Sequence, residues 1–297
     1  MDRMPDFRMM RKVNCHFKEQ PLPGRGLCAL WGCMTGFLLM LGRPVVDLVR
    51  YLGELAQLVG DVFLSVFRHP VRWKLVLYQI VNIGFGSQLQ VMVTGAFTGA
   101  VFAAQVYYKF NQLGFESVVG GIVALALCRE LAPVLTGLML TSRVGASIAA
   151  EIGTMKVTEQ VDALRSLGVH PVDYLVSPRL LAIVFSMPIL IGESILMGMW
   201  AAKLIVVSLY GVPEAFYNDQ LDKNTDMTDL MFGMTKGVVF GILIVLISCH
   251  QGLKVNRGAV GVGMGTTAAV VITSLSILVV NFFLTMALNF VWPVART

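Results

Sequence analysis

The stretch EIGTMKVTEQVDALRSLG, from Glu151 to Gly168, is a polar interruption between two long apolar runs of the chain. Its part from Thr154 to Leu167 contains neither proline nor glycine, whereas Gly153 comes before it and Gly168 and Pro171 come after it. Glycine and proline just beyond a periodic segment are typical helix stop signals. The pattern therefore predicts a helix of about three turns, too short to form a domain.

The composition around this stretch is that of a membrane protein. Hydrophobic residues make up 56% of the 297 residues and charged residues only 14%, whereas a soluble domain has about 25% charged residues. The apolar residues form long runs, and the ten-residue alternation of barrel strands is not seen. The chain is predicted to be an all-α, polytopic membrane protein.

Five apolar runs are each long enough for the roughly 20 residues that a membrane-spanning helix needs. They extend from about Leu89 to Tyr108, Val118 to Val144, Leu180 to Leu209, Leu230 to Cys249, and Thr266 to Trp292. The predicted transmembrane domain covers residues 75–297.

The first 74 residues have a different character. Residues 1–40 form a basic extension with a short apolar segment at 26–42, for which we favour an interfacial or re-entrant segment over a secretory signal. Within residues 41–74, apolar side chains recur at steps of three and four, at Leu48, Leu52, Leu55, Val59, Val62 and Val66. This pattern is typical of a helix in the membrane interface or packed on the outside of the bundle.

Charge asymmetry sets the expected orientation. Eleven of the 23 Lys and Arg residues lie in the first 74 positions, and Arg143, Lys156, Arg165 and Arg179 flank or occupy the polar stretch. The positive-inside rule places these segments in the cytoplasm. The acidic loop from Tyr210 to Asp229 then lies outside. The net charge of +5 is attributed to lipid headgroups rather than to a nucleic-acid partner.

Polar side chains inside the apolar runs are costly in lipid and are functional candidates. They are Arg129, Glu130, Glu193, Lys203, Lys236 and Asn281. Neighbouring residues on a helix point about 100° apart, so Arg129 and Glu130 are expected to pair with other helices and not with each other. Two roles stay open: holding the bundle together, or lining a hydrated or headgroup-binding cavity.

Two glycine rows indicate close helix contacts. They are Gly95 with Gly99, and Gly233 with Gly237 and Gly241. Such rows let helix backbones approach in lipid, and packing within the bundle is favoured over a dimer seam.

Motifs for chemistry are absent from the sequence. It contains no nucleotide-binding loop, no HExxH and no GxSxG, and its five cysteines and four histidines lack metal-ligand spacing. No catalytic residues, metal site or cofactor are expected in this chain, so ATP hydrolysis would need a separate subunit.

The polar stretch itself has two faces. Val157, Val161 and Leu164 follow helical steps on one face, and charges of both signs follow on another. A plain surface connector would satisfy this pattern. Mixed charges beside an apolar strip also suit docking into a groove of a protein partner.

The segment RELAPVLTGLMLTSRVGASIAAEIGTMKVTEQVDALRSLGVHPVDYLVSPRLLA, Arg129 to Ala182, closely resembles the signature of MlaE-type permeases, the membrane subunits of ABC-type lipid transporters that work with MCE-domain proteins. The resemblance extends more loosely from about Pro70 to Val291. It implies five transmembrane helices, an N-terminal interfacial helix and a cytoplasmic coupling helix at about 151–168. The sequence departs from the family pattern at Ala132 and Ser142, where glycine is usual, and at Asn281, where an acidic residue is common.

The resemblance also implies a function. It is that of a homodimeric permease in the bacterial inner membrane, with a cytoplasmic N-terminus, that moves phospholipid or a related lipid between membranes. An organelle inner envelope membrane is the alternative location. A partner ABC ATPase would bind ATP and Mg, and a periplasmic MCE-domain lipid-binding protein would lie on the outer face.

The expected site residues fall into two sets. Those expected to contact the ATPase are Glu151, Thr154, Met155, Thr158, Glu159, Asp162 and Leu164. Those expected in a lipid cavity or an intramembrane polar site are Arg129, Glu130, Glu193 and Asn281. The alternative function is an ion-coupled secondary transporter of a hydrophobic substrate, which would use Glu130, Glu193 or Lys203 for coupling.

Overall fold

The structure is a computed structural model that describes residues 46, 49–62, 64, 73–115, 118–256 and 258–291. The chain divides into two units, residues 1–53 and 54–297. In the first unit only residues 46 and 49–53 are described, and they are helical. The basic extension and its apolar segment at 26–42 lie outside the described residues.

Five helices of the second unit are long and apolar enough to cross a membrane, which confirms the predicted all-α, polytopic fold. They are Trp73–Asn111, Val119–Val157, Val172–Leu209, Met227–Leu253 and Gly258–Phe290. The first three extend well beyond the predicted limits on the side of the polar stretch.

Several of these helices contain five-residue π-helical segments, labelled η. The first consists of α2 (Trp73–Ile80), η2 (Val81–Phe85) and α3 (Gly86–Asn111). The second consists of α4 (Val119–Ala126), η4 (Leu127–Leu131), α5 (Ala132–Leu140), η5 (Thr141–Gly145) and α6 (Ala146–Val157). The third consists of η6 (Val172–Val176), α8 (Ser177–Leu204) and η7 (Ile205–Leu209). The fourth is α10 (Met227–Leu253) and the fifth is α11 (Gly258–Val291).

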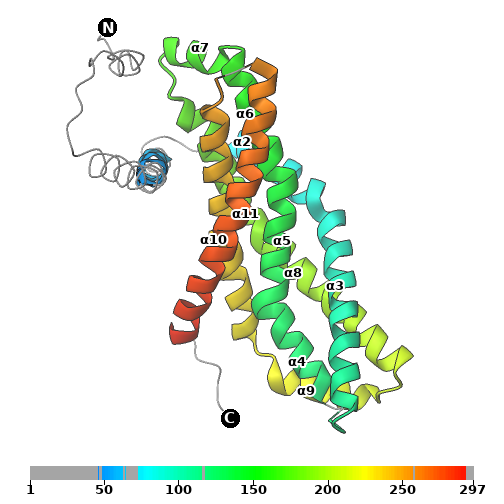
Figure 1. The fold of residues 1–297 in the computed structure, drawn as a ribbon. Coiled ribbons are helices and arrows are strands. Elements are labelled where there is room, and N and C mark those ends of the chain that lie inside the picture. Colours follow the sequence, from blue (N-terminus) through cyan, green and yellow to red (C-terminus); the bar gives the residue numbers. More distant parts are fainter. Residues whose placement is uncertain are drawn as a thin grey trace, which may run out of the picture. The chain divides into compact units, whose positions relative to one another are not determined.

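Helix α10 is the most buried of the five and packs against α5, α6, α8 and α11 (Figure 1). Glycines allow the closest contacts between these helices. A Cβ atom built on Gly99 of α3 would lie 2.2 Å from the carbonyl oxygen of Gly198 in α8, and one on Gly237 would lie 2.0 Å from the Cδ1 atom of Ile191. The glycine rows therefore pack within the bundle, as predicted.

Residues 54–62 of the amphipathic segment are helical and lie against the bundle. Leu58 and Val62 are buried and Leu55 is partly buried in the main core cluster, whereas Val59 is 42% exposed. The expected apolar face is thus wrong at Val59, because Leu58 takes the inward position.

The acidic loop between the third and fourth membrane-spanning helices contains a helix that the sequence analysis did not predict. Helix α9 (Glu214–Asn224) packs on α4, where Tyr217 is buried beside Gly120. Burial raises the pKa of Tyr217 to about 12.

The polar stretch does not form the single helix predicted from Thr154 to Leu167. Helix α6 continues the second membrane-spanning helix through Gly153 to Val157, and a separate α7 (Gln160–Ser166) follows. Gly153 is a packing position rather than a helix stop, because a Cβ atom there would lie 3.3 Å from Val255. The break comes at Glu159, whose φ of 60° is left-handed. The predicted end at Gly168 is confirmed by its φ of 74°.

Candidate functional site

A polar network joins the second, fourth and fifth membrane-spanning helices. Its centre is Lys236 of α10, whose side chain is 0% exposed. The Lys236 Nζ atom donates to Glu130 Oε1 at 2.8 Å, to Thr285 Oγ1 at 2.7 Å and to the carbonyl oxygen of Arg129 at 2.9 Å. The ammonium group therefore has three acceptors and one counter-charge, as a buried cation requires.

The Arg129 carbonyl oxygen is available to Lys236 because its regular helical donor would be residue 133, and Pro133 has no N–H. A π-helical turn widens the helix and disturbs the regular ladder of backbone hydrogen bonds, and such turns are frequent at functional sites. Arg129 and Glu130 both lie in η4. Gly233 lets α10 approach this segment, since a Cβ atom there would lie 2.3 Å from the carbonyl oxygen of Cys128.

Arg129 and Glu130 have different partners. Its Nε atom forms a buried ion pair with Asp229, and its NH1 group donates to Asn289 Oδ1 at 3.3 Å. The second Asp229 carboxylate oxygen accepts from the Asp226 backbone N–H at the start of α10. The expectation that Arg129 and Glu130 pair with neighbouring helices and not with each other is confirmed.

The network brings together three of the four expected intramembrane site residues. Asn281 Nδ2 donates to Glu130 Oε2 at 3.2 Å, so an amide serves where a carboxylate was common in the resembled family. Glu193 is not part of the network, and it accepts instead from Gln88 Nε2 at 2.9 Å.

Sequence reasoning missed Asp229, Thr285 and Asn289. Asp229 was counted with the acidic loop, although its spacing of seven residues from Lys236 puts both on one face of a helix. Thr285 follows Asn281 by four residues, which gives the same signal.

The second candidate region is called here the knob, defined as residues 151–168, the end of α6 and all of α7 (Figure 1). Lys156 Nζ lies 2.9 Å from Asp162 Oδ2, and Arg165 lies 3.6 Å from Asp162 Oδ1. The Lys156–Asp162 pair joins α6 to α7 across the break at Glu159, whereas the Arg165–Asp162 pair lies within α7. They are partly or largely exposed, and such pairs contribute at most about 1 kcal/mol each.

Apolar side chains fix the knob to the bundle more firmly than its charges do. Val161 is fully buried, and Met155 and Leu164 are partly buried against the main core cluster. Of the seven residues expected to contact an ATPase, these last two point largely inward. The other five, Glu151, Thr154, Thr158, Glu159 and Asp162, are exposed.

One buried cation ties the base of the knob to the third membrane-spanning helix. The Arg179 side chain is 4% exposed, and its NH2 group lies 2.8 Å from Glu151 Oε2. Its NH1 group donates to the carbonyl oxygen of Leu175 at 3.1 Å, in the π-helical segment η6. Any displacement of the knob therefore acts on α8 as well as on α6.

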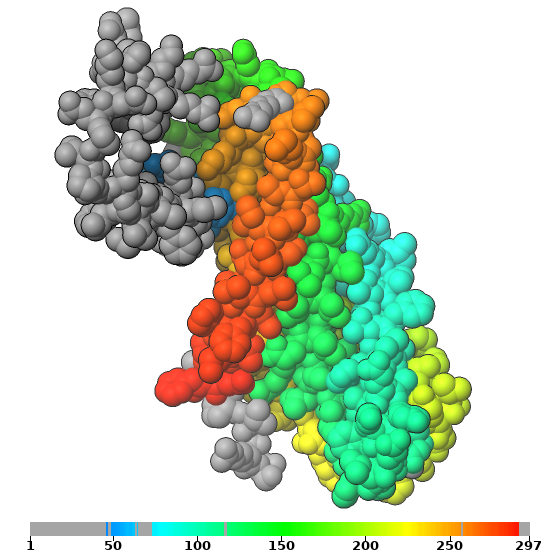
Figure 2. All heavy atoms as spheres, in the orientation of Figure 1, coloured from blue at the N-terminus to red at the C-terminus, as the bar shows by residue number. Residues whose placement is uncertain are grey.

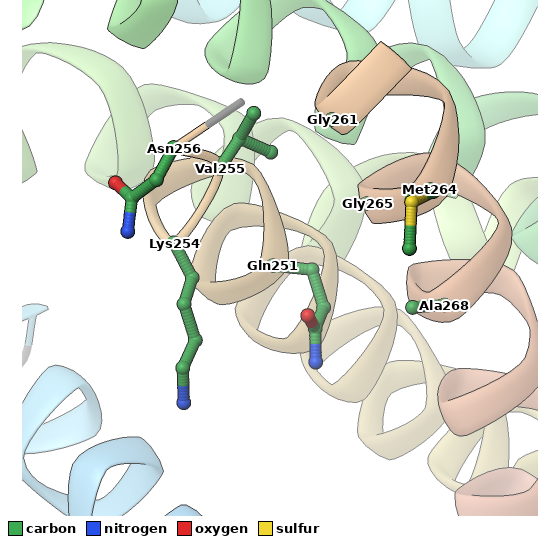
Figure 3. Close-up of a pocket in the computed structure, with 8 residues that line it drawn as sticks. All are labelled: Gln251, Lys254, Val255, Asn256, Gly261, Met264, Gly265 and Ala268. Carbon is green, nitrogen blue, oxygen red and sulfur yellow. The ribbon is translucent and has the colours of Figure 1, made fainter. Parts of the chain in front are cut away.

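An open pocket of about 300 Å³ lies beside the same end of the bundle. Gln251 and Lys254 line it from the end of α10, and Met264 lines it from the first turns of α11 (Figure 3). Lys254 is the one charged lining residue, and its Nζ atom already lies 2.9 Å from Glu54 Oε2. The described lining of the pocket therefore offers no unpaired charge for a ligand.

Comparison with known proteins gives a consistent picture. Residues 76–287 match the model of the MlaE permease family. A probable ABC transporter permease of Synechocystis is 41% identical over 227 residues, which cover 76% of this chain and 86% of that protein. A probable ABC transporter permease of Rickettsia bellii is 39% identical over 245 residues, covering 82% and 95%.

A plant relative is also similar. The Arabidopsis thaliana chloroplast protein named trigalactosyldiacylglycerol 1 is 36% identical over 227 residues, which cover 76% of this chain and 65% of that protein. Family membership favours an ATP-driven class over the ion-coupled alternative. The chain belongs to the MlaE permease family, whose members are multi-pass membrane subunits of ABC transporters and leave ATP hydrolysis to a partner subunit.

Proposed function

We propose that this permease moves phospholipid or a related lipid between membranes, driven by an ABC ATPase that binds the cytoplasmic knob. The observation that carries the proposal is the unbroken helical run from Val119 to Val157. It holds Arg129 and Glu130 of the polar network in its first half and ends in the knob. Movement of the knob is transmitted along this one helix to the network.

The surface of the knob suits a protein partner. Exposed charges of both signs, at Glu159, Asp162 and Arg165, surround its tip. The apolar Leu167 is 76% exposed beside them. An exposed apolar anchor within a polar rim is the usual anatomy of a protein interface. We assign Thr154, Thr158, Glu159 and Asp162 to the ATPase contact, and Met155 and Leu164 to holding the knob on the bundle.

The polar network supports a lipid substrate. Glu130 keeps 40% of its side chain exposed, while its partner Lys236 is fully buried. Its carboxylate is therefore the part of the network that an amphipathic substrate reaches. The Arabidopsis relative is named after a galactosylated diacylglycerol, which points to the same chemical class.

The other partners follow from the family resemblance. Helix α11 is the least buried of the five spans, and Figure 2 shows it uncovered along one face of the molecule. We assign this helix to lipid and to a second copy of the chain. We place the protein in the bacterial inner membrane with the N-terminus and knob in the cytoplasm, and an MCE-domain lipid-binding protein outside. An organelle inner envelope membrane is the alternative, and ATP and Mg bind to the ATPase in either case.

The test is a charge reversal at the exposed end of the knob. Glu159→Lys is expected to leave membrane insertion intact and to release the ATPase, because it places a cation at the centre of the contact. The measurement is the ratio of ATPase to permease after affinity purification from membranes. The matched control is Asp222→Lys, an equally exposed carboxylate on α9 at the other end of the bundle.

The control should retain the ATPase at the wild-type ratio. Co-purification of a working ATPase with Glu159→Lys at that same ratio contradicts the coupling assignment.

A further inference from the structure

Glu193 stands apart from the other ionisable groups in and around the membrane-spanning helices. Four acid–base pairs neutralise most of these groups: Arg129 with Asp229, Lys236 with Glu130, Arg179 with Glu151, and Lys203 with Glu214. Glu193 lies near the middle of the third span and forms no ion pair with any described residue. Its one recorded partner is the neutral amide of Gln88.

The carboxylate lies on the outward row of α8. Ile189 and Leu196, four residues before and three after Glu193, are 69% and 70% exposed. Steps of three and four bring residues to the same side of a helix. Phe185 and Trp200 extend this exposed row by one turn at each end.

Helix α3 continues the same surface. Leu89, next to Gln88, is exposed, and Val93 and Phe97 follow it at four-residue steps. The backbones of α3 and α8 touch at Gly95 and Ser194 and again at Gly99 and Gly198. The two outward rows therefore form one apolar face, called here the α3–α8 face, with the Gln88–Glu193 pair set into it.

Lipid chains alone do not suit this arrangement. A carboxylate among hydrocarbon is costly without a cation or a proton, and polar groups at this depth usually find partners on neighbouring helices. The face offers a negative group surrounded by large apolar side chains. Its complement is an apolar helix with one cation.

We propose that the α3–α8 face binds a transmembrane helix of a partner protein that presents a lysine or arginine at the depth of Glu193. The charge complementarity fixes the depth and register of that helix, and Leu89, Phe97, Ile189 and Leu196 supply the apolar contact. The face lies on helices other than the knob, so this binding is separate from that of the ATPase.

The test uses a synthetic probe. The full-length permease is reconstituted in phosphatidylcholine vesicles with a labelled transmembrane peptide of leucine and alanine that carries one central arginine, and binding is followed by energy transfer. The matched peptide has leucine at that position. The arginine peptide is expected to bind the wild type roughly five- to thirty-fold more tightly, the range of one interhelical polar contact in lipid.

Glu193→Gln should abolish that preference, since it keeps an acceptor for Gln88 and removes the charge. Asp222→Asn on α9 should not change it. Glu193→Lys should instead prefer a peptide with a central glutamate, which excludes misfolding as the cause of lost binding. Equal binding of both peptides to the wild type, or an unchanged preference in Glu193→Gln, would overturn the proposal and leave Glu193 as a packing residue.

Discussion

The polar network around Lys236 and the knob both interrupt apolar sequence, but they differ in how far their charges are buried. In the network, Arg129, Asp229 and Lys236 are almost fully buried and each has a partner on another helix. In the knob, Asp162 and its partners stay at least partly exposed, and the buried Val161 anchors the segment. The network thus holds helices together. The knob is held to the bundle by apolar contacts, and its charges stay accessible to a partner.

The largest effect should come from the buried side of this comparison. Lys236→Met leaves Glu130 without its counter-charge and Arg129 without a donor for its carbonyl oxygen, a change that costs roughly 3–5 kcal/mol when a buried pair is broken. The midpoint of thermal unfolding in detergent measures this effect. The control is Lys203→Met, which breaks the more exposed pair with Glu214 and should shift the midpoint little.

The double variant Lys236→Met, Glu130→Leu should recover much of the loss, because no unpaired charge remains. If Lys236→Met is no less stable than Lys203→Met, the network does not hold the helices together.

A smaller effect is expected at the base of the knob, where one buried cation joins it to α8. Glu151→Gln removes the charge opposite Arg179, whose side chain is buried while that of Glu151 is 55% exposed. The loss of stability should be roughly 1 kcal/mol, because Gln keeps an acceptor for Arg179 but the hydrogen bond loses its counter-charge. The sharper readout is lipid transported per ATP hydrolysed in vesicles, which should fall while the ATPase stays bound.

Glu214→Gln is the control, since it removes an exposed carboxylate at the opposite end of the bundle. A wild-type transport ratio in Glu151→Gln would show that α8 does not take part in coupling.

The smallest effect concerns the loss of stability at low pH that comes from one exposed ion pair. Hydrogen bonding to Lys203 and its positive charge lower the pKa of the Glu214 carboxyl below its ordinary value of 4.5. Because the folded-state pKa is lowered, the stabilisation is complete above pH 4.5 and is lost as the pH falls through the folded value. Thermal unfolding measured from pH 6 to below pH 4 should show a slight decline that Lys203→Met reduces.

A steep decline that persists in Lys203→Met would show that the acid sensitivity does not come from this pair.

Sequence patterns predicted much of the fold because a bilayer imposes simple rules. Run length indicated the five spans, and polar residues in lipid indicated Arg129, Glu130 and Asn281 as one candidate set. Partners at the ends of apolar runs were not predictable in the same way. Asp229 is read from sequence as part of an acidic loop, and only the start of α10 shows that it faces Arg129.

The knob shows the limit of local stop signals. Gly153 reads in the sequence as a helix end. In the structure it lies inside α6, where the lack of a side chain lets the helix pack against Val255. The actual break is at Glu159, a residue with no special preference for a left-handed backbone. The short α9 was missed because its composition is that of a polar loop, and its order depends on burial of Tyr217 against α4.

The length of the second membrane-spanning helix has one more consequence. Its 39 residues from Val119 to Val157 correspond to about 58 Å of helix, whereas the hydrocarbon core of a bilayer is about 30 Å thick. Even when tilted, the helix projects well past the headgroups before it reaches Glu159. A soluble protein that binds there stands clear of the lipid, at a distance set by the number of helical turns. Removing one turn would bring that protein about 5 Å nearer the membrane and rotate its binding surface.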